Sequence, residues 1–426
     1  MAFQRESSSK RFFIVFGLVF FLYQIVAARL VTAHPSGPAV FDVTKFDAKG
    51  NGKPEYTEDY ENANSLSFIQ AWQKACNNIG PSKLVIPKGT FVVAQVLFSG
   101  PCQSQVTVEL QGTITADPDP SVFPNQELIV FQQVEGAIFT GTGSINVNQP
   151  QPPCDSEKSF TFMEVMPSIK FSNATSCVVD GIHSLNPAQF HVLVENSNNI
   201  SIVNANFDAT TVKPNTRSNA IYVSGSSLVS VANTNIKTGD ECITISGGSA
   251  DISVTGVTCV AGKGISVGAQ LDGFHPDYNV KGVKVKNCTF KGTSFGARIN
   301  ARPTDKVGEV SNIIFEDLVM DQALNPIGIK QDYLPLPDKP NLAKITNVHF
   351  KNIRGTTTTN AAVSFVCSKL APCDEIKVSD VNLSFTGKST LVDKSSLVGK
   401  VANILSTTCV NAKVKFSGKH DGLNCA

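Results

Sequence analysis

The sequence predicts an all-β fold: a single-stranded right-handed parallel β-helix with a short N-terminal capping helix. Pairs of apolar residues, separated by one position and followed by Gly, Ser or Asn, recur along the chain. One series repeats at steps of 22 residues: Ile221-x-Val223, Ile243-x-Ile245 and Ile265-x-Val267. A second series repeats at less regular steps: Ile200-x-Ile202, Val229-x-Val231, Ile252-x-Val254, Val283-x-Val285 and Ile313-x-Phe315. This periodicity is typical of a stacked solenoid, in which neighbouring coils bury an apolar column that one coil could not bury alone.

The N-terminal segment, residues 1–33, is predicted to be a secretory signal peptide. A polar and net basic start is followed by an apolar stretch from Phe12 onward and then by small residues at Ala27, Ala28 and Ala33. That order is typical of cleaved signal peptides. A retained membrane anchor is the alternative, because the apolar stretch approaches the shortest length of a spanning helix. Residues 34–426 are expected to form one domain that has no membrane association after cleavage.

A helix over residues 65–76 is predicted to cover the open N-terminal end of the solenoid, where strand edges would otherwise be exposed. Asn64 or Ser65 could cap it. One face of this helix is apolar: Phe68, Ile69, Trp72, Ala75 and Cys76. Since Trp72 lies in that stripe, we expect it to pack against the core and not to stack on a sugar.

Three segments are expected to be loops: 148–156, 301–309 and 332–340. Prolines in 148–156 remove the backbone donors that a strand ladder would need. Long loops of a solenoid commonly wall a groove along one face, so the other two are expected to line a binding site.

The 11 cysteines predict disulfides, because export places the chain in an oxidising compartment. Cys367–Cys373 and Cys409–Cys425 would each close a short loop, and Cys242 could pair with Cys259 on the neighbouring coil. An odd count leaves at least one free thiol, for which Cys288 is the candidate. The partners of four cysteines stay open: Cys76, Cys102, Cys154 and Cys177. None has CxxC spacing, so no zinc or other metal site is expected.

Four glycosylation sequons fit a secreted glycoprotein: Asn173, Asn199, Asn287 and Asn382. Asn287 is the weakest of them, because Cys288 and Phe290 are expected to be packed. The formal net charge of +1 gives no overall field for a polyanion. A basic stripe interleaved with aromatic residues is also missing, so nucleic acid is not an expected partner.

Four short motifs follow in order on successive predicted coils: Asn215-Thr216-Arg217, Gly239-Asp240-Glu241-Cys242, Gly262-Lys263-Gly264 and Arg298-Ile299-Asn300. Their order and spacing resemble plant polygalacturonases, glycoside hydrolase family 28. That family carries Asn-Thr-Asp, Gly-Asp-Asp-Cys, Gly-His-Gly and Arg-Ile-Lys at the same stations. The resemblance extends from 41–52 to the cysteine-rich C-terminus, and it implies a pectin-lyase-like solenoid that hydrolyses homogalacturonan.

The resemblance implies catalytic roles for two carboxylates. Inverting hydrolysis needs one carboxylic acid to protonate the leaving oxygen and other carboxylates to activate water. Asp240 matches the acid, and Glu241 replaces the second carboxylate. Arg217 stands where the third is expected, and arginine cannot act as a base in a protein. A fixed cation close to Asp240 would also favour its ionised form, whereas a general acid must carry a proton.

At the remaining motif positions, the resemblance implies contacts with the substrate. Lys263 replaces a histidine beside the acid; it could pair with Asp240 or Glu241, but it cannot exchange protons at about pH 5 as histidine can. Arg298 matches a residue that grips a galacturonate carboxylate, a task that suits its planar fork. Asn300 replaces the lysine that accompanies it. Tyr333 resembles the tyrosine that lines the cleft.

We therefore expect a secreted, inactive or weakly active, monomeric protein of the plant cell wall (apoplast) that still binds homogalacturonan or oligogalacturonides. One alternative is an active polygalacturonase in which Asp240 is the acid and Glu241 alone positions water. Another is a non-catalytic interaction protein that binds wall inhibitor or receptor proteins. A pectate lyase is disfavoured, because that chemistry needs calcium held by clustered carboxylates. No cofactor is expected.

Overall fold

The computed structural model describes residues 37–59, 61–147, 166–209, 218–268, 276–301, 304–331, 340–387, 405–420 and 422–425. Contacts divide the chain into two units, Met1–Ala39 and Val40–Ala426. The predicted signal peptide and the predicted loop at 148–156 lie outside the described residues, as does nearly all of the loop predicted at 332–340. Among the described residues, no helix has the length and apolar character needed to cross a membrane.

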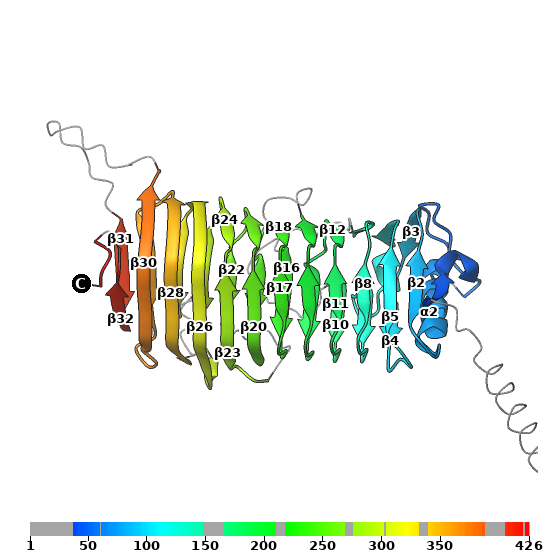
Figure 1. Cartoon of the computed structure of the whole chain (residues 1–426), viewed down its shortest axis with the longest axis horizontal. Helices are drawn as coiled ribbons and strands as arrows, with labels where there is room; N and C mark the ends of the chain where they lie inside the picture. The colour runs from blue at the N-terminus through cyan, green and yellow to red at the C-terminus, as the bar shows by residue number, and fades with distance from the viewer. Residues whose placement is uncertain are drawn as a thin grey trace, which may run out of the picture. The chain divides into compact units, whose positions relative to one another are not determined.

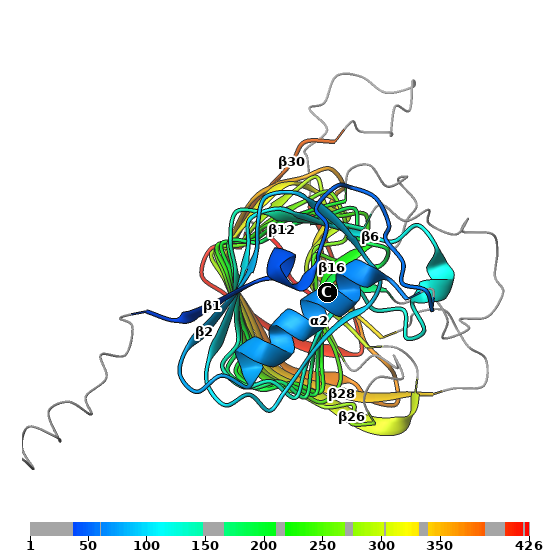
Figure 2. The same ribbon diagram turned by 90° about the vertical axis from the view of Figure 1, so that its right-hand side faces the viewer.

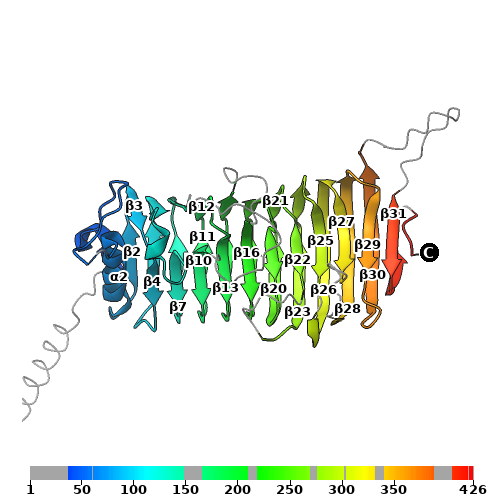
Figure 3. The same ribbon diagram turned by 180° about the vertical axis from the view of Figure 1, so that it is seen from behind.

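The unit Val40–Ala426 is a parallel β-helix, as predicted, built from three columns of parallel strands (Figures 1 and 3). The first column begins with β1 (Ala39–Asp42) beside β2 and continues through these strands: β2 (Ser82–Ile86), β5 (Val106–Leu110), β8 (Ile138–Thr140), β11 (Val178–Asp180), β14 (Ser201–Val203), β17 (Ser230–Ala232), β20 (Ser249–Thr255), β23 (Val280–Lys286), β26 (Thr304–Ala323), β28 (Asn341–Thr357), β30 (Cys373–Phe385) and β32 (Ala412–Ser417).

The second column joins the first at β26, a long strand that pairs with both β23 and β24. Its separate strands are β3 (Thr90–Val93), β6 (Thr113–Ala116), β9 (Ser144–Asn146), β12 (His183–Leu185), β15 (Asn206–Asp208), β18 (Asn235–Lys237), β21 (Thr258–Val260) and β24 (Thr289–Lys291).

The third column is an 11-stranded sheet of its own. Its strands are β4 (Val96–Ser99), β7 (Ile129–Gln132), β10 (Pro167–Ser172), β13 (Phe190–Glu195), β16 (Asn219–Ser224), β19 (Ile243–Ile245), β22 (Ile265–Val267), β25 (Phe295–Asn300), β27 (Asn325–Lys330), β29 (Ala361–Val366) and β31 (Ser406–Val410).

The strand register confirms both predicted repeats. Ile221, Ile243 and Ile265 pair in sequence on adjacent strands of the third column. In the first column, Val254 pairs with Val285, which pairs with Phe315. These side chains are fully buried between the columns. Burial of each such side chain contributes about 1.5–3 kcal/mol, so the stack is held by its continuous apolar interior.

Helix α2 (Ala63–Cys76) lies across the N-terminal end of the stack, as predicted (Figure 2). The predicted cap at Asn64 or Ser65 is wrong, because the Asn62 side chain accepts the Ser65 N–H instead. Asn64 is turned inward, where its amide donates to the Val92 carbonyl at 3.0 Å. Trp72 is buried; it stacks on Phe98 with a centroid distance of 4.7 Å, which confirms a packing role. Two short 3-10 helices, η1 (Val43–Phe46) and η2 (Pro120–Val122), complete the described helices.

Four disulfides link the described cysteines, and three of them were predicted. These are Cys242–Cys259, Cys367–Cys373 and Cys409–Cys425. The fourth, Cys76–Cys102, ties the capping helix to the first coils. Cys288 is free and buried, as predicted, and so is Cys177. Cys154 lies outside the described residues.

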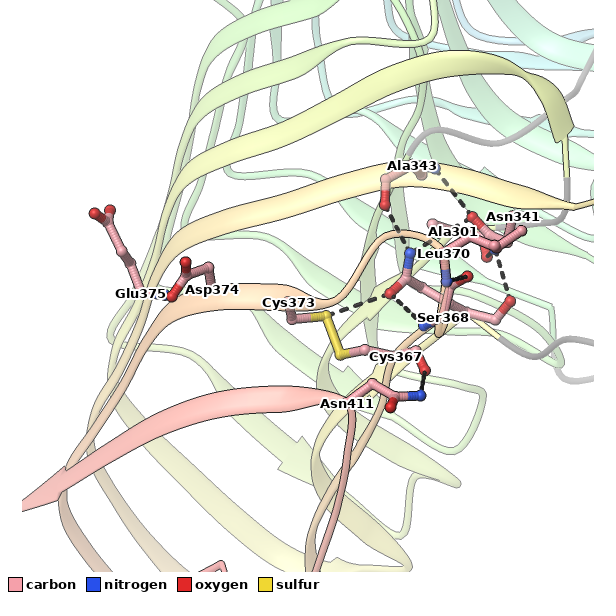
Figure 4. Close-up of a disulfide and its surroundings, with 11 residues drawn as sticks. Ala301, Asn341, Ala343, Cys367, Ser368, Leu370, Cys373, Asp374, Glu375 and Asn411 are labelled. Carbon is pink, nitrogen blue, oxygen red and sulfur yellow. Dashed lines mark hydrogen bonds between the residues drawn. A yellow bond between two sulfur atoms is a disulfide. The ribbon is translucent and has the colours of Figure 1, made fainter.

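The surroundings of Cys367–Cys373 show how a disulfide fixes a turn near the C-terminal end (Figure 4). The Asn411 amide donates to the Cys367 carbonyl at 3.0 Å, and the Ser368 N–H donates to the Gln331 side chain at 3.0 Å. The Gln331 amide in turn donates to the Ala343 carbonyl, so strands of successive coils are joined at this point.

The predicted loop at 301–309 is wrong over most of its length. Strand β26 already begins at Thr304, which pairs with Asn341, and Gly308 pairs with Ala343. This part of the chain carries few apolar residues, so its sequence gave no strand pattern. Backbone pairing with β28 supplies the hydrogen bonds that nevertheless make it a strand.

Candidate active site

Three successive coils of the third column bring the sequence-predicted residues together. Asp240 and Glu241 precede β19, Lys263 precedes β22, and Arg298 lies within β25. The Lys263 N–H donates to the Asp240 carbonyl at 2.8 Å, so the 22-residue step becomes a direct backbone contact. The Cys242–Cys259 disulfide fixes the chain immediately after Glu241.

The glycines on either side of Lys263 are required by the backbone. Gly262 and Gly264 have φ of +65° and +75°, a conformation that other residues rarely adopt. A Cβ on Gly262 would lie 2.5 Å from the Asp240 carbonyl oxygen, and one on Gly264 would lie 2.3 Å from that of Gly296. The Gly-x-Gly motif therefore allows close packing of the coils and places the middle side chain beside Asp240.

Lys263 and Asp240 form an ion pair at the surface of the site. The Lys263 ammonium lies 2.8 Å from the Asp240 carboxylate, which confirms one of the two predicted pairings. The Asp240 side chain is 13% exposed and that of Lys263 is 40% exposed. The pair is thus open to solvent on the lysine side, and the carboxylate already has a cationic partner.

Glu241 and Arg298 form a second pair beneath the surface. The Arg298 guanidinium contacts one Glu241 carboxylate oxygen, and the two residues are 4% and 8% exposed. Burial raises the pKa of Glu241 to about 7; the charge of Asp240 adds to this effect, while Arg298 and Lys263 oppose it. Arg298 also lies over the Phe295 ring, 4.2 Å from its centroid.

Three polar atoms of the site are buried without a hydrogen-bond partner among the described residues: Glu241 Oε2, Arg298 Nε and Asn300 Oδ1. Asn300 is 3% exposed, at the end of β25. Unpaired buried polar atoms cost free energy in the folded protein.

Two predicted site residues, Arg217 and Tyr333, lie outside the described residues, and their roles stay predictions. Among the described segments, no group of three or more His, Cys, Asp or Glu side chains is placed to hold a metal ion.

The same sheet face has two features that the sequence analysis missed. Phe190, Leu193 and Tyr222 form a small apolar cluster on β13 and β16, separate from the main core. Nearer the N-terminal end, a pocket of about 410 Å³ opens over β4, β7 and β10. In it Lys170 lies 2.9 Å from Glu127 and also 2.9 Å from Glu195. Strand β13 is buried at every position from Phe190 to Val194, although it includes His191, and such a nearly continuous buried run signals a sheet with both faces covered.

Comparison with known proteins agrees with this architecture. The model of glycosyl hydrolases family 28 matches residues 76–405. A polygalacturonase of Gossypium barbadense is 33% identical over 407 residues, which cover 93% of each chain. An exopolygalacturonase of Arabidopsis thaliana, clone GBGE184, is 35% identical and covers 92% of this chain and 89% of its own.

Solved structures share the fold at lower identity. A hyperthermoactive exopolygalacturonase from Thermotoga maritima superposes with a TM-score of 0.71 at 14% identity and covers 92% of both chains. An endo-xylogalacturonan hydrolase from Aspergillus tubingensis gives 0.68 at 17% identity and covers 90% of this chain and all of that one. The family match and these relatives show that the chain belongs to glycosyl hydrolase family 28.

Proposed function

We propose that this chain is a secreted polygalacturonase-family protein of the plant cell wall that binds homogalacturonan and has lost most or all hydrolase activity. Residues 1–33 would be removed, and the mature protein would act as a monomer without a cofactor. The asparagines of the four sequons, Asn173, Asn199, Asn287 and Asn382, all have exposed positions, which supports glycosylation.

The observation that carries the proposal is the state of the two carboxyl groups. The Lys263 ammonium lies 2.8 Å from the Asp240 carboxylate, and a fixed cation beside a carboxyl group favours the carboxylate, whereas the general acid must carry a proton. Glu241 deviates in the opposite direction, because it favours the protonated form where the mechanism needs a carboxylate. With a pKa raised to about 7 by burial, it holds a proton at mildly acidic pH and cannot activate water as a base.

Binding of the polymer is supported by the cation that faces solvent. Lys263 is 40% exposed and can contact a galacturonate carboxylate while it stays near Asp240. Arg298 is buried against Glu241, so it would reach a substrate carboxylate only through a local opening or through its unpaired Nε. We therefore assign the larger share of binding to Lys263, and to Arg217 by sequence.

The test is reducing-end release from polygalacturonic acid between about pH 4 and 6, where the family chemistry needs one protonated and one ionised carboxyl. The mature chain is compared with Asp240→Asn and with a triple variant, Arg217→Asp with Lys263→His and Asn300→Lys. We expect the triple variant to exceed the native chain by at least about 100-fold, because it restores acid–base groups. Lys291→His, an exposed lysine on β24, is the matched control and should change nothing.

Turnover by the native chain that disappears in Asp240→Asn would overturn the loss of activity and favour an active hydrolase with Asp240 as acid. Binding is measured separately, with short oligogalacturonides at low and moderate salt. No affinity at either salt concentration would overturn the retained binding, and would leave the interaction-protein alternative.

A further inference from the structure

A second cationic surface lies on the first column, away from the candidate site. Strands β23, β26, β28, β30 and β32 stack in order toward the C-terminal end (Figure 1). Alternation along these strands buries one set of side chains and turns the other set outward. We call the outward set the lysine face, defined by Lys281, Lys284, Lys286, Lys351, Lys377 and Lys415.

One row of the lysine face carries no acid. Lys284 pairs in register with Ile314, then His349, then Lys377 and finally Lys415. Adjacent strands lie about 4.8 Å apart, so Lys377 and Lys415 are direct neighbours. Among the described residues, neither they nor Lys284 forms an ion pair. Like charges in neighbouring register positions are destabilising, so this arrangement has a cost in the free protein.

The acids on this face are mostly neutralised by neighbouring lysines. Glu316 contacts the Lys286 ammonium and lies 2.7 Å from that of Lys351, and hydrogen bonds from both lower its pKa to about 2. Asp374 lies 3.1 Å from Lys413. Other acids on these strands are Glu309, in register with Lys344, and Glu375, beside Asp374. Asp317 accepts from the Asn352 amide at 2.6 Å, and Asp380 is exposed three residues after Lys377. The register row of Lys284, Lys377 and Lys415 therefore contains no acid, and the acids of β30, which are Asp374, Glu375 and Asp380, lie on either side of Lys377 along the strand.

The fold does not require lysine at these positions. In β20, the residues in register with Lys284 and Lys286 are Ser253 and Thr255. One coil earlier, in β17, they are Ser230 and Ala232. The same outward positions thus accept small neutral residues in the middle of the stack. Lys83 on β2 continues the row at the N-terminal end, but it lies 2.6 Å from Glu109, so the described lysines of this row without an ion pair are those of the last coils.

We propose that the lysine face binds a de-esterified polyuronate chain that lies along the stack, across the strands. Such a polymer carries one carboxylate on each sugar unit, and Lys284, Lys377 and Lys415 lie in one register row across the strands, so several carboxylates of one chain can meet these lysines. The face belongs to a different sheet from β19, β22 and β25, so it would hold the polymer without cutting it. Only the identity of the polymer rests on the proposed function.

The test uses the mature chain with Lys284→Ser, Lys377→Ser and Lys415→Ser combined, serine being the residue in register at position 253. The control combines Lys45→Ser, Lys53→Ser and Lys88→Ser, three exposed lysines at the other end of the stack, and changes the net charge equally. Affinity for immobilised, fully de-esterified polygalacturonate is measured at low salt. We expect a loss of about tenfold in the face variant and little change in the control. Equal losses in both, or none in the face variant, would overturn the proposal.

Glu316→Gln provides a gain of binding that misfolding could not produce. It releases Lys286 and Lys351 from their shared acid, and we expect affinity to rise about threefold. Unchanged or weaker binding would count against the lysine face. Polyglutamate of matched length is the second probe, and binding as tight as that of polygalacturonate through the same lysines would overturn the polyuronate assignment.

The two proposals fail separately. Turnover of short oligogalacturonides by the Arg217→Asp, Lys263→His, Asn300→Lys variant should not change when the three face lysines are replaced. If turnover fell by the same factor as the affinity for the polymer, the face lysines would belong to the candidate site. That result would overturn the proposal of a separate binding surface.

Discussion

The candidate site and the lysine face use the same kinds of charge in opposite surroundings. In the site, Arg298 is 4% exposed and in contact with Glu241. On the lysine face, Lys377 and Lys415 are exposed and have no ion-pair partner among the described residues. A charge in a dry interior must be paired because solvation is lost, whereas an exposed one is stabilised by water. The buried cation is therefore already committed to an internal partner, and the exposed ones are available to a ligand.

The largest expected effect comes from breaking the buried pair. Arg298→Met at about pH 8 leaves the Glu241 carboxylate buried without its cation, and we expect a loss of about 3–5 kcal/mol in the free energy of unfolding. Denaturant unfolding measures it. At about pH 5 the loss should be smaller, because Glu241 can take up a proton when its pKa is raised.

Arg354→Met is the matched control, since Arg354 is exposed on β28. It should cost less than about 1 kcal/mol. Equal losses in the two variants would mean that burial does not distinguish the site from the surface.

The next effect is a pH dependence that only the buried carboxyl should produce. The pKa of Glu241 rises from its ordinary value of 4.5 to about 7 on folding. Below about pH 4.5 the group is neutral in both states. Between 4.5 and 7 the folded state retains a proton that the unfolded state releases, so its relative stability falls as the pH rises.

Glu241→Gln should remove this dependence. The free energy of unfolding of the native chain, relative to this variant, should fall by about 3 kcal/mol across that window and stay constant above it. Parallel unfolding measurements at several pH values test this. A constant difference would show that Glu241 stays ionised beside Arg298 throughout.

The fold could be predicted because it depends on local repeats. The step of 22 residues through Ile221, Ile243 and Ile265 is visible in the sequence and becomes strand register directly. The helix cap was harder, because Asn62, Asn64 and Ser65 can all cap a helix, and the choice depends on a contact between Asn64 and Val92. The strand at Thr304 was missed because its stability comes from pairing with β28 and not from its own apolar pattern.

The charged surfaces were predictable only in part. The closeness of Lys263 to Asp240 follows from the same 22-residue step, and sequence reasoning found it. The pairing of Arg298 with Glu241 joins residues on nonadjacent coils and depends on burial, which no motif reports. Lys284, Lys377 and Lys415 are far apart along the chain, and loops of unequal length hide their common row until the register is known.

A smaller effect is expected for the half-exposed pair of the site. Lys263→Met removes the partner of Asp240, but solvent screens that pair on the lysine side. The free energy of unfolding should fall by at most about 1 kcal/mol. Thermal and denaturant unfolding measure it, and a loss as large as that of Arg298→Met would show that Asp240 is as desolvated as Glu241.

The smallest effect on stability is expected on the lysine face. Lys377→Ser should leave the free energy of unfolding within about 0.5 kcal/mol of the native value, because the residue is exposed and unpaired. Within that range we expect a slight increase in the free energy of unfolding, because the change relieves repulsion with Lys415 in the neighbouring register position. The same purified variant serves for unfolding and for polygalacturonate binding. A loss above about 1 kcal/mol would give the lysine a structural role. Unchanged stability with weakened binding would separate the ligand surface from the framework that carries it.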